Sequence, residues 1–166
     1  VVQSDLFDTI DNEYTDDQVK IALRHCGYID PESIEEYEEN EGYRAIRKIA
    51  GHGMSRLDVI QTMIESGLRG RGGGGFPAGR KWEAGLQAKG TPKYVVCNGD
   101  EGDPGAFMDR ALLEGDPHAV LEGILIGAYA IGALEGYIYI RGEYHLSQQR
   151  MAKAVEQANE AGYLGK

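Results

Sequence analysis

The chain has 166 residues, a formal net charge of −10 at pH 7, 24 glycines and two cysteines. A chain of this length can bury a substantial core, and no apolar run reaches the roughly 20 residues that cross a bilayer, so direct membrane insertion is not expected. The sequence has no basic stripe interleaved with aromatic residues, which argues against a nucleic-acid partner.

The negative charge is concentrated at the N-terminus. Thirteen acidic residues against two basic ones give residues 1–41 a charge of −11, whereas the rest of the chain carries +1. We predict two domains: residues 1–54 as an acidic N-terminal arm with short helices, and residues 55–166 as an α/β domain. The arm, irregular over residues 1–15, is expected to be a solvated face, and docking to a partner subunit is the alternative.

The first part of the chain is predicted to contain three short elements. A short strand is expected over residues 18–23. Asp30 followed by Pro31 is typical of a helix start, so we expect a helix over residues 31–40. Another helix is expected over residues 43–50.

The second part alternates helices with strands. Ser55 is a typical cap for a helix that ends before Gly67. The elements expected after Ser55 are a helix to residue 65, a helix over 80–88, a buried strand from residue 93, a helix over 117–131, a strand over 136–141 and a helix over 146–161. This alternation predicts an α/β fold, a Rossmann-like layered sheet that is mainly parallel, with helices on both faces and a helical N-terminal extension.

The glycine-rich run Ser66–Trp82 is the most informative segment, and it contains four consecutive glycines. Glycine has no Cβ, so the backbone can approach a ligand closely and direct successive N–H groups at an anion. Basic and aromatic side chains lie in the same run: Arg69, Arg71, Phe76, Arg80, Lys81 and Trp82. We expect a loop that binds a phosphorylated, planar cofactor; the alternative is a long turn with solvated arginines.

Neither of two familiar phosphate-binding motifs describes this run. The glycine spacing over residues 70–75 fits a dinucleotide fingerprint, but that motif needs a preceding strand, and the preceding residues have helical periodicity. The spacing over residues 74–79 fits a P-loop, but Arg80 takes the place of its lysine and no Ser or Thr follows to hold magnesium.

A second candidate site follows the strand that starts near residue 93. In open α/β sheets, ligands bind beyond the carboxyl ends of strands, and four polar residues lie there: Asn98, Asp100, Glu101 and Asp103. The amide both donates and accepts hydrogen bonds, and the carboxylates accept them from ribityl or ribose hydroxyls. The alternative is an Asp- and Gly-rich turn without a ligand.

Metal and cluster ligands are scarce. His118 and His145 have no companion ligands at metal-binding spacing, so no metal site is expected. Cys26 and Cys97 are too few for a four-iron cluster, which needs four thiolates. Two separated cysteines indicate reduced thiols, from which we expect a cytoplasmic protein.

Four motifs together resemble a known family. They are Ser66–Trp82, Asn98–Arg110, Asp116–His118 and Gly136–Tyr144. In these segments the chain is similar to the flavin-bearing NADH-dehydrogenase subunit, the family of the 51-kDa subunit of respiratory complex I. Residues 29–37 and 103–110 are more similar to the branch found in NAD(P)-linked hydrogenases and formate dehydrogenases. The resemblance covers residues 26–166.

The resemblance implies noncovalent FMN that receives hydride from NADH or NADPH and passes electrons to iron–sulfur clusters. The implied FMN-binding residues are Gly70, Arg71, Gly72, Gly73, Lys81, Asn98, Asp100 and Glu101. The implied substrate-binding residues are Phe76, Glu101 and Asp103, and Glu101 is also the implied catalytic residue. Complex I members commonly carry Glu where Asp103 stands.

By the same resemblance, the cluster motif and a second glycine-rich segment lie beyond residue 166, so we expect a fragment or one piece of a split subunit. Iron–sulfur clusters are then expected in that further region or in partner subunits of a multisubunit complex. The sequence thus predicts the FMN-binding part of an NAD(P)H dehydrogenase. The alternative is a non-catalytic interaction or assembly module that keeps the fold without flavin.

Overall fold

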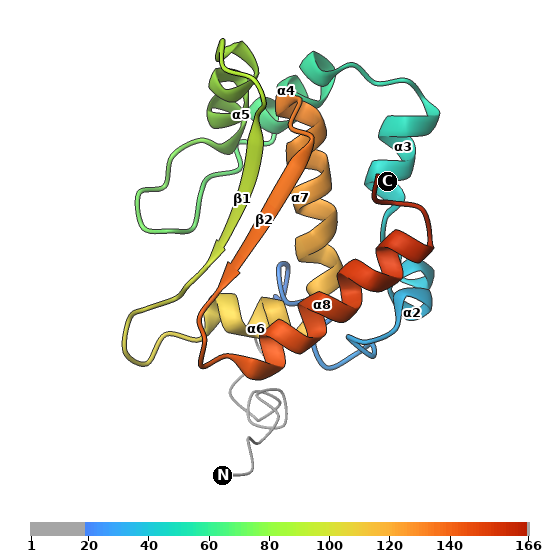
Figure 1. Cartoon of the computed structure of the whole chain (residues 1–166), viewed down its shortest axis with the longest axis vertical. Helices are drawn as coiled ribbons and strands as arrows, with labels where there is room; N and C mark the ends of the chain where they lie inside the picture. Colours follow the sequence, from blue (N-terminus) through green and yellow to red (C-terminus); the bar gives the residue numbers. More distant parts are fainter. Residues whose placement is uncertain (1–18, 166) are drawn as a thin grey trace. The chain divides into compact units, whose positions relative to one another are not determined.

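The computed structural model describes residues 19–165 (Figure 1). Its elements are α2 (Ile34–Glu39), α3 (Arg44–Gly51), α4 (Arg56–Glu65), α5 (Ala78–Gln87), β1 (Tyr94–Gly99), α6 (Met108–Gly115), α7 (Pro117–Ile131), β2 (Glu135–Ile140) and α8 (His145–Glu160). Strands β1 and β2 lie side by side and run in the same direction (Figure 1). The prediction of an α/β fold with parallel strands is confirmed, whereas the predicted arm over residues 1–15 lies outside the described residues.

The backbone divides into two compact units. Among the described residues, the first contains those up to Gly42, Asn98–Leu121 and those from Tyr139 onward; the second contains Tyr43–Cys97 and Glu122–Ile138. The domain boundary that the sequence predicts after residue 54 stays a prediction.

The first unit has its core between α6 and α8, which pack against each other. Met151, Ala154 and Ala158 are buried along one face of α8, at the spacing that places residues on a single side of a helix. Ala111 and Leu113 are buried on α6. These two helices support the loop that follows β1.

Two predictions about the first unit are wrong at its N-terminal side. The strand expected over residues 18–23 is absent, because the described residues from Ile21 onward form bends and turns. Residues 22–28 form consecutive turns, in which the Cys26 N–H donates to the Leu23 carbonyl at 3.1 Å, and these local hydrogen bonds replace those of a strand.

The start of α2 also differs from the expected position at Pro31. The Asp30 carboxylate accepts a hydrogen bond from the Glu32 N–H at 2.8 Å and so forms a turn of its own. The Ser33 hydroxyl then accepts the Glu36 N–H at 3.2 Å and caps the helix, which begins at Ile34.

The second unit has a core of Ile49, Val59, Ile60 and Ala130 from α3, α4 and α7. Ser55 caps α4 as expected: its hydroxyl accepts the Asp58 N–H, and the Asp58 carboxylate accepts the Ser55 N–H. The helix predicted from residue 80 begins earlier, at Ala78.

A close approach of α4 and α5 depends on Gly79, which is buried. A Cβ at this position would lie 2.6 Å from the Ile64 backbone nitrogen and 2.7 Å from its Cγ1. The glycine therefore allows the first turn of α5 to lie against α4, and this contact places the start of α5 at the end of the glycine-rich run.

Strand β1 is less buried than predicted. Its side chains alternate between exposed and half-buried, and only Gly99 at its end is buried. Tyr94 is 46% exposed and Val96 65% exposed, both on the same face, as expected from the twofold period of a strand. The β-branched run thus predicts the strand correctly but not its burial.

Candidate cofactor-binding loops

The glycine-rich run forms a loop that closes at its base, within the second unit. Arg69 and Pro77 form an isolated antiparallel bridge. Its two hydrogen bonds join the Gly70 N–H to the Phe76 carbonyl at 2.8 Å and the Ala78 N–H to the Leu68 carbonyl at 2.9 Å. The Arg69 guanidinium donates to the Gly75 carbonyl at 2.9 Å. The loop between these residues is therefore shaped by its own backbone.

The glycines at the tip of this loop face open space. A Cβ at any position from Gly72 to Gly75 would have no atom within 4 Å. Gly73 (φ 95°) and Gly75 (φ 58°) need glycine for their left-handed backbone, but Gly72 and Gly74 have no positive φ. Neither packing nor conformation explains these two, whereas a ligand lying against the bare backbone would. The loop therefore fits a cofactor that approaches closely.

The four basic side chains of the run fall into two pairs. Arg69 closes the loop, and Arg80 forms an ion pair with Glu83 at 2.9 Å. Arg71 and Lys81 are exposed, and neither forms an ion pair within the described part of the chain. These two cations are available to an anionic ligand.

The start of α5 adds to this positive character. Pro77 is its N-cap and supplies no side-chain hydrogen bond to the first turn. The N-terminus of a helix carries partial positive charge and favours phosphate, and Lys81 follows directly in the same helix.

The two aromatic residues of the run differ in their surroundings. Phe76 is 60% exposed. Trp82 packs on the core of the second unit, and its ring lies 3.4 Å from where a Cβ of Gly127 would be. Of these two side chains, Phe76 is the exposed one.

The acidic loop after β1 belongs to the first unit. The strand ends at Gly99, where a Cβ would come within 2.9 Å of Leu113 Cδ1, so α6 packs closely against the strand end. The Asn98 amide oxygen accepts the Asp100 N–H at 3.1 Å, and Asp103 is exposed at the loop tip. The loop is thus closely packed where it leaves β1, and Asp103 lies on its exposed part.

Glu101 is the central residue of this loop. Its φ is 46°, a left-handed conformation that is uncommon for a residue with a side chain. Its carboxylate accepts the N–H groups of Asp109 and Arg110, each at 2.8 Å. Its carbonyl accepts the Tyr144 hydroxyl at 3.3 Å and lies 3.5 Å from the Arg141 guanidinium.

These contacts account for α6, a helix that the sequence patterns did not predict. Phe107 is the N-cap of α6 but makes no side-chain cap, and the Glu101 carboxylate satisfies two of the free N–H groups instead. Burial, and then the negative charge of Glu101, raise the pKa of Asp109 above its ordinary value.

A buried polar network lies below α6. The Glu114 carboxylate is fully buried and accepts Arg110 Nε at 2.9 Å and the Ser147 hydroxyl at 3.0 Å. The Arg110 guanidinium lies 5.5 Å from the centre of the Tyr144 ring. The sequence alone indicated no role for Arg110, Glu114 or Tyr144, although Arg110 and Tyr144 lie in the motifs that carry the family resemblance.

Two other kinds of site are absent from residues 19–165. No group of three or more His, Cys, Asp or Glu side chains in this range is arranged to hold a metal ion. None of the helices in the same range is both long and apolar enough to span a bilayer.

Comparison with known protein families places residues 63–164 in the Nuo51 FMN-binding domain. Over 148 residues the chain is 53% identical to the NADP-reducing hydrogenase subunit HndC of Solidesulfovibrio fructosivorans, covering 89% of this chain and 30% of that protein. It is 44% identical to a subunit of the NADH-quinone oxidoreductase of Aquifex aeolicus, covering 92% of this chain and 35% of that protein. The chain thus spans about a third of the length of these relatives.

A solved structure is also similar to this chain. The NAD+-reducing [NiFe]-hydrogenase in the air-oxidized state matches with a TM-score of 0.68 and 29% identity, over 89% of this chain and 24% of that chain. The resemblance that the sequence motifs indicate, to the family of flavin-bearing NADH-dehydrogenase subunits, is therefore confirmed.

Proposed function

The chain belongs to the Nuo51 FMN-binding domain family, and from this membership we propose that it forms the FMN-binding part of an NAD(P)H-oxidising subunit. The observation that carries the proposal concerns Gly72 and Gly74, where neither packing nor backbone conformation requires glycine. The same loop exposes Arg71 and Lys81. A backbone that is open to a ligand and a pair of exposed cations are what a phosphorylated, planar cofactor requires.

In this proposal the glycine-rich loop holds the phosphate side of FMN. Gly70, Gly72 and Gly73 present bare backbone to the cofactor, and Arg71 and Lys81 balance its negative charge. The Gly70 N–H closes the loop on the Phe76 carbonyl, so the donors to the cofactor are the N–H groups of Gly72 and Gly73. Lys81 follows the first residues of α5, so its ammonium group and the helix N-terminus act on the same anion.

The acidic loop holds the sugar-like chain and the ring edge. Asn98, Asp100 and Glu101 accept hydrogen bonds from the ribityl hydroxyls. A carboxylate has about four acceptor positions, and Glu101 uses two of them on α6. It can therefore keep its loop in place and still accept a hydrogen bond from a ligand.

The nicotinamide nucleotide is bound by Phe76, Glu101 and Asp103. The exposed ring of Phe76 offers a stacking face, and the two carboxylates accept hydrogen bonds at the nicotinamide side. Bound FMN supplies the chemistry that couples a two-electron hydride donor to one-electron acceptors. The role of the protein residues is to orient donor and cofactor at reacting distance.

The electron acceptors are proposed to be iron–sulfur clusters, outside this chain, in a hydrogenase-type complex. The names of the relatives support this context: one is a subunit of an NADP-reducing hydrogenase and the other a subunit of an NADH-quinone oxidoreductase. The formate-dehydrogenase context, the choice between NADH and NADPH, and the cytoplasmic location stay predictions. A measurement of FMN binding distinguishes this function from the alternative, an assembly module without flavin.

Titration of the protein with FMN tests the proposal. Flavin fluorescence is quenched on binding, and we expect the protein to bind FMN with micromolar affinity. Gly72→Ala and Lys81→Ala should each weaken binding by about tenfold, equivalent to about 1.4 kcal/mol. Gly90→Ala and Lys89→Ala are matched controls, because both residues are exposed and a Cβ at Gly90 meets no atom within 4 Å.

Quenching that is absent at high protein concentration would support the assembly module. If FMN binding is weakened equally in the control variants, the glycine-rich loop is not part of the FMN site.

A further inference from the structure

Glu101 adopts a backbone conformation that glycine adopts more readily. Its φ of 46° lies in the left-handed region, where a Cβ is unfavourable. The same loop contains Gly99, Gly102 and Gly105, yet this left-handed position carries a glutamate. A conformation of this kind persists only where the surrounding contacts hold it, and it is typical of functional sites. The contacts that hold Glu101 therefore indicate which residues prepare this loop for a ligand.

Contacts at two places hold Glu101. Its carboxylate accepts the N–H groups of Asp109 and Arg110 at the start of α6, each at 2.8 Å. Its backbone carbonyl accepts the Tyr144 hydroxyl at 3.3 Å. The carboxylate contacts position the side chain, whereas the contact at the carbonyl acts directly on the backbone, where the uncommon conformation lies.

The Tyr144 ring is itself held by two arginines. The guanidinium carbons of Arg110 and Arg141 lie 5.5 and 5.9 Å from the ring centre. A cation at this distance from an aromatic ring is attracted to it. Arg110 also donates Nε to the buried Glu114 carboxylate at 2.9 Å. Because the Arg110 N–H binds the Glu101 carboxylate, both contacts of Glu101 lead to the same group of side chains.

Tyr144 lies where β2 passes to α8, and short-range hydrogen bonds hold its backbone. Its N–H donates to the Arg141 carbonyl at 3.1 Å, and its carbonyl accepts the Gln148 N–H at 3.0 Å. It is the N-cap of α8 but makes no side-chain cap. N-cap positions favour Ser, Thr, Asp and Asn, so capping does not explain a tyrosine here. Its hydroxyl reaches Glu101 instead.

We propose that Tyr144 is a positioning residue for the flavin site, whose hydroxyl holds the Glu101 backbone so that the Glu101 carboxylate has its ligand-binding position before FMN binds. This role rests on the proposed function, in which Glu101 accepts a hydrogen bond from the cofactor. A loop that is ordered in advance loses less conformational freedom on binding and therefore binds more tightly. Tyr144 acts through Glu101 and not by contact with the ligand.

The variant Tyr144→Phe tests the role of the hydroxyl. It removes the donor to the Glu101 carbonyl and keeps the ring with its contacts to Arg110 and Arg141. We expect FMN to bind about tenfold more weakly in a fluorescence titration, as expected for the loss of one hydrogen bond. The circular dichroism spectrum of the flavin-free variant should match that of the wild type.

A double-mutant cycle distinguishes positioning from a general effect on the fold. If Tyr144 acts through Glu101, Tyr144→Phe weakens FMN binding about tenfold in the wild-type background but less than about twofold in a Glu101→Ala background. A hydroxyl that only stabilises the fold would weaken binding by the same factor in both backgrounds.

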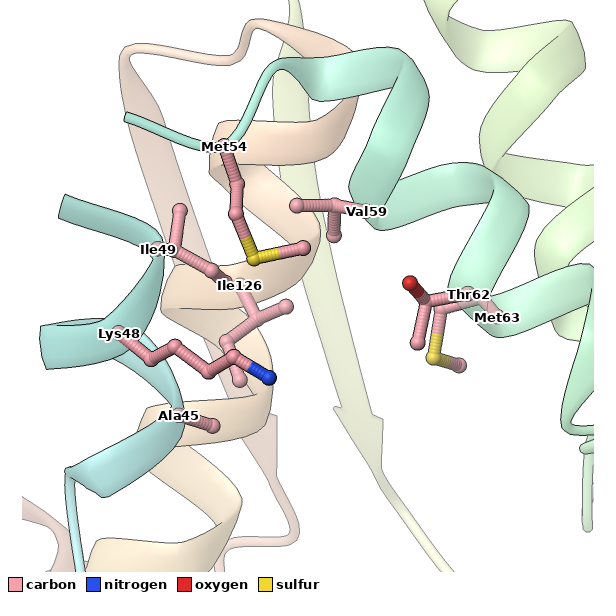
Figure 2. A pocket seen from close by; sticks show the side chains of 8 residues that line it. All are labelled: Ala45, Lys48, Ile49, Met54, Val59, Thr62, Met63 and Ile126. Carbon is pink, nitrogen blue, oxygen red and sulfur yellow. The ribbon is translucent and has the colours of Figure 1, made fainter. Parts of the chain in front are cut away.

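Two matched controls each remove one hydroxyl outside the contacts of Glu101. Tyr163→Phe removes a hydroxyl that donates to Glu38 in the same unit. Thr62→Val removes a hydroxyl that donates to the Asp58 carbonyl at 2.8 Å. Figure 2 shows the Thr62 side chain at the wall of an apolar pocket in the second unit, which shares no residue with the contacts of Glu101. Both controls should bind FMN within about twofold of the wild type.

Equal FMN affinity of Tyr144→Phe and the wild type would overturn the positioning role. Equal weakening by Tyr144→Phe in both backgrounds, or weakening of the same size in either control, would also overturn it. No binding of FMN to the wild-type protein would overturn the proposed function, and this role with it.

Discussion

Glu122 caps helix α3 by accepting a hydrogen bond from the backbone N–H of Tyr43 at 2.9 Å, across 79 positions of sequence. Its other carboxylate oxygen accepts the N–H groups of Ala45 and Ile46 at 3.1 and 3.2 Å. Tyr43 is the N-cap of α3, has a φ of 54°, and makes no side-chain cap of its own. A buried carboxylate on α7 thus replaces the local cap that the sequence lacks.

Removal of this cap is expected to destabilise the protein. Glu122→Ala leaves buried N–H groups at the start of α3 without their acceptor, which costs about 3 kcal/mol of unfolding free energy. Urea denaturation followed by circular dichroism measures the change. Glu160→Ala, at an exposed position of α8, is the control and should change stability by less than about 0.5 kcal/mol. Equal changes would contradict the capping role.

Gly79→Ala is expected to destabilise the packing of α4 against α5. The new Cβ would lie 2.6 Å from the Ile64 nitrogen, and backbone cannot yield as a flexible side chain does. Overpacking of this kind costs about 1–3 kcal/mol. Gly74→Ala, which adds a Cβ in open space, should leave the stability of the flavin-free protein unchanged. A thermal melt of both variants checks the difference, and a stable Gly79→Ala protein would argue against this close contact.

Glu101→Gln separates a structural role from a ligand-binding role. The amide keeps one acceptor oxygen but turns an NH2 group toward an N–H of α6, so we expect a loss of about 1–2 kcal/mol in the flavin-free protein. Asp103→Asn, on the same loop but exposed, should not change the stability without ligand. Unfolding in urea without FMN is the measurement. Unchanged stability of Glu101→Gln would show that the cap contributes little.

The stability of the protein is expected to fall as the pH drops below about 6.5. Burial lowers the pKa of His118 from its ordinary 6.5, and the Gln157 hydrogen bond and the charges of Asp116, Glu35 and Glu38 oppose this shift without reversing it. The unfolded chain then binds a proton at a higher pH than the folded chain does. Stability is therefore fully present above 6.5 and is lost as the pH falls through the folded pKa.

The variant His118→Phe isolates this effect. It keeps a ring to stack on Tyr37, whose ring centre lies 5.5 Å from that of His118, but it has no proton to bind. Unfolding free energies at pH 5, 6 and 7 are the measurement. We expect the difference between wild type and variant to shift in favour of wild type as the pH rises. A constant difference would rule out His118 as the titrating group.

Local sequence was sufficient for most helices and for the identity of the loops. Ser55 and Asp58 form their capping box within a few residues, so the start of α4 could be read from the sequence. The glycine-rich run and the polar residues after β1 were also recognised as ligand-binding candidates, because bare backbone and clustered carboxylates are visible without a structure. The family follows from the order of these motifs.

Contacts between distant residues decided the rest. Helix α6 is capped by Glu101 from the preceding loop, and α3 by Glu122 from α7, so neither cap is visible in the flanking sequence. The structure also decided which cations are engaged: the exposed Arg69 guanidinium donates to the Gly75 carbonyl, whereas the exposed Lys81 forms no ion pair within the described part of the chain. Residue types and spacing set local propensities, but the partner of a buried polar group depends on which segments the fold brings together.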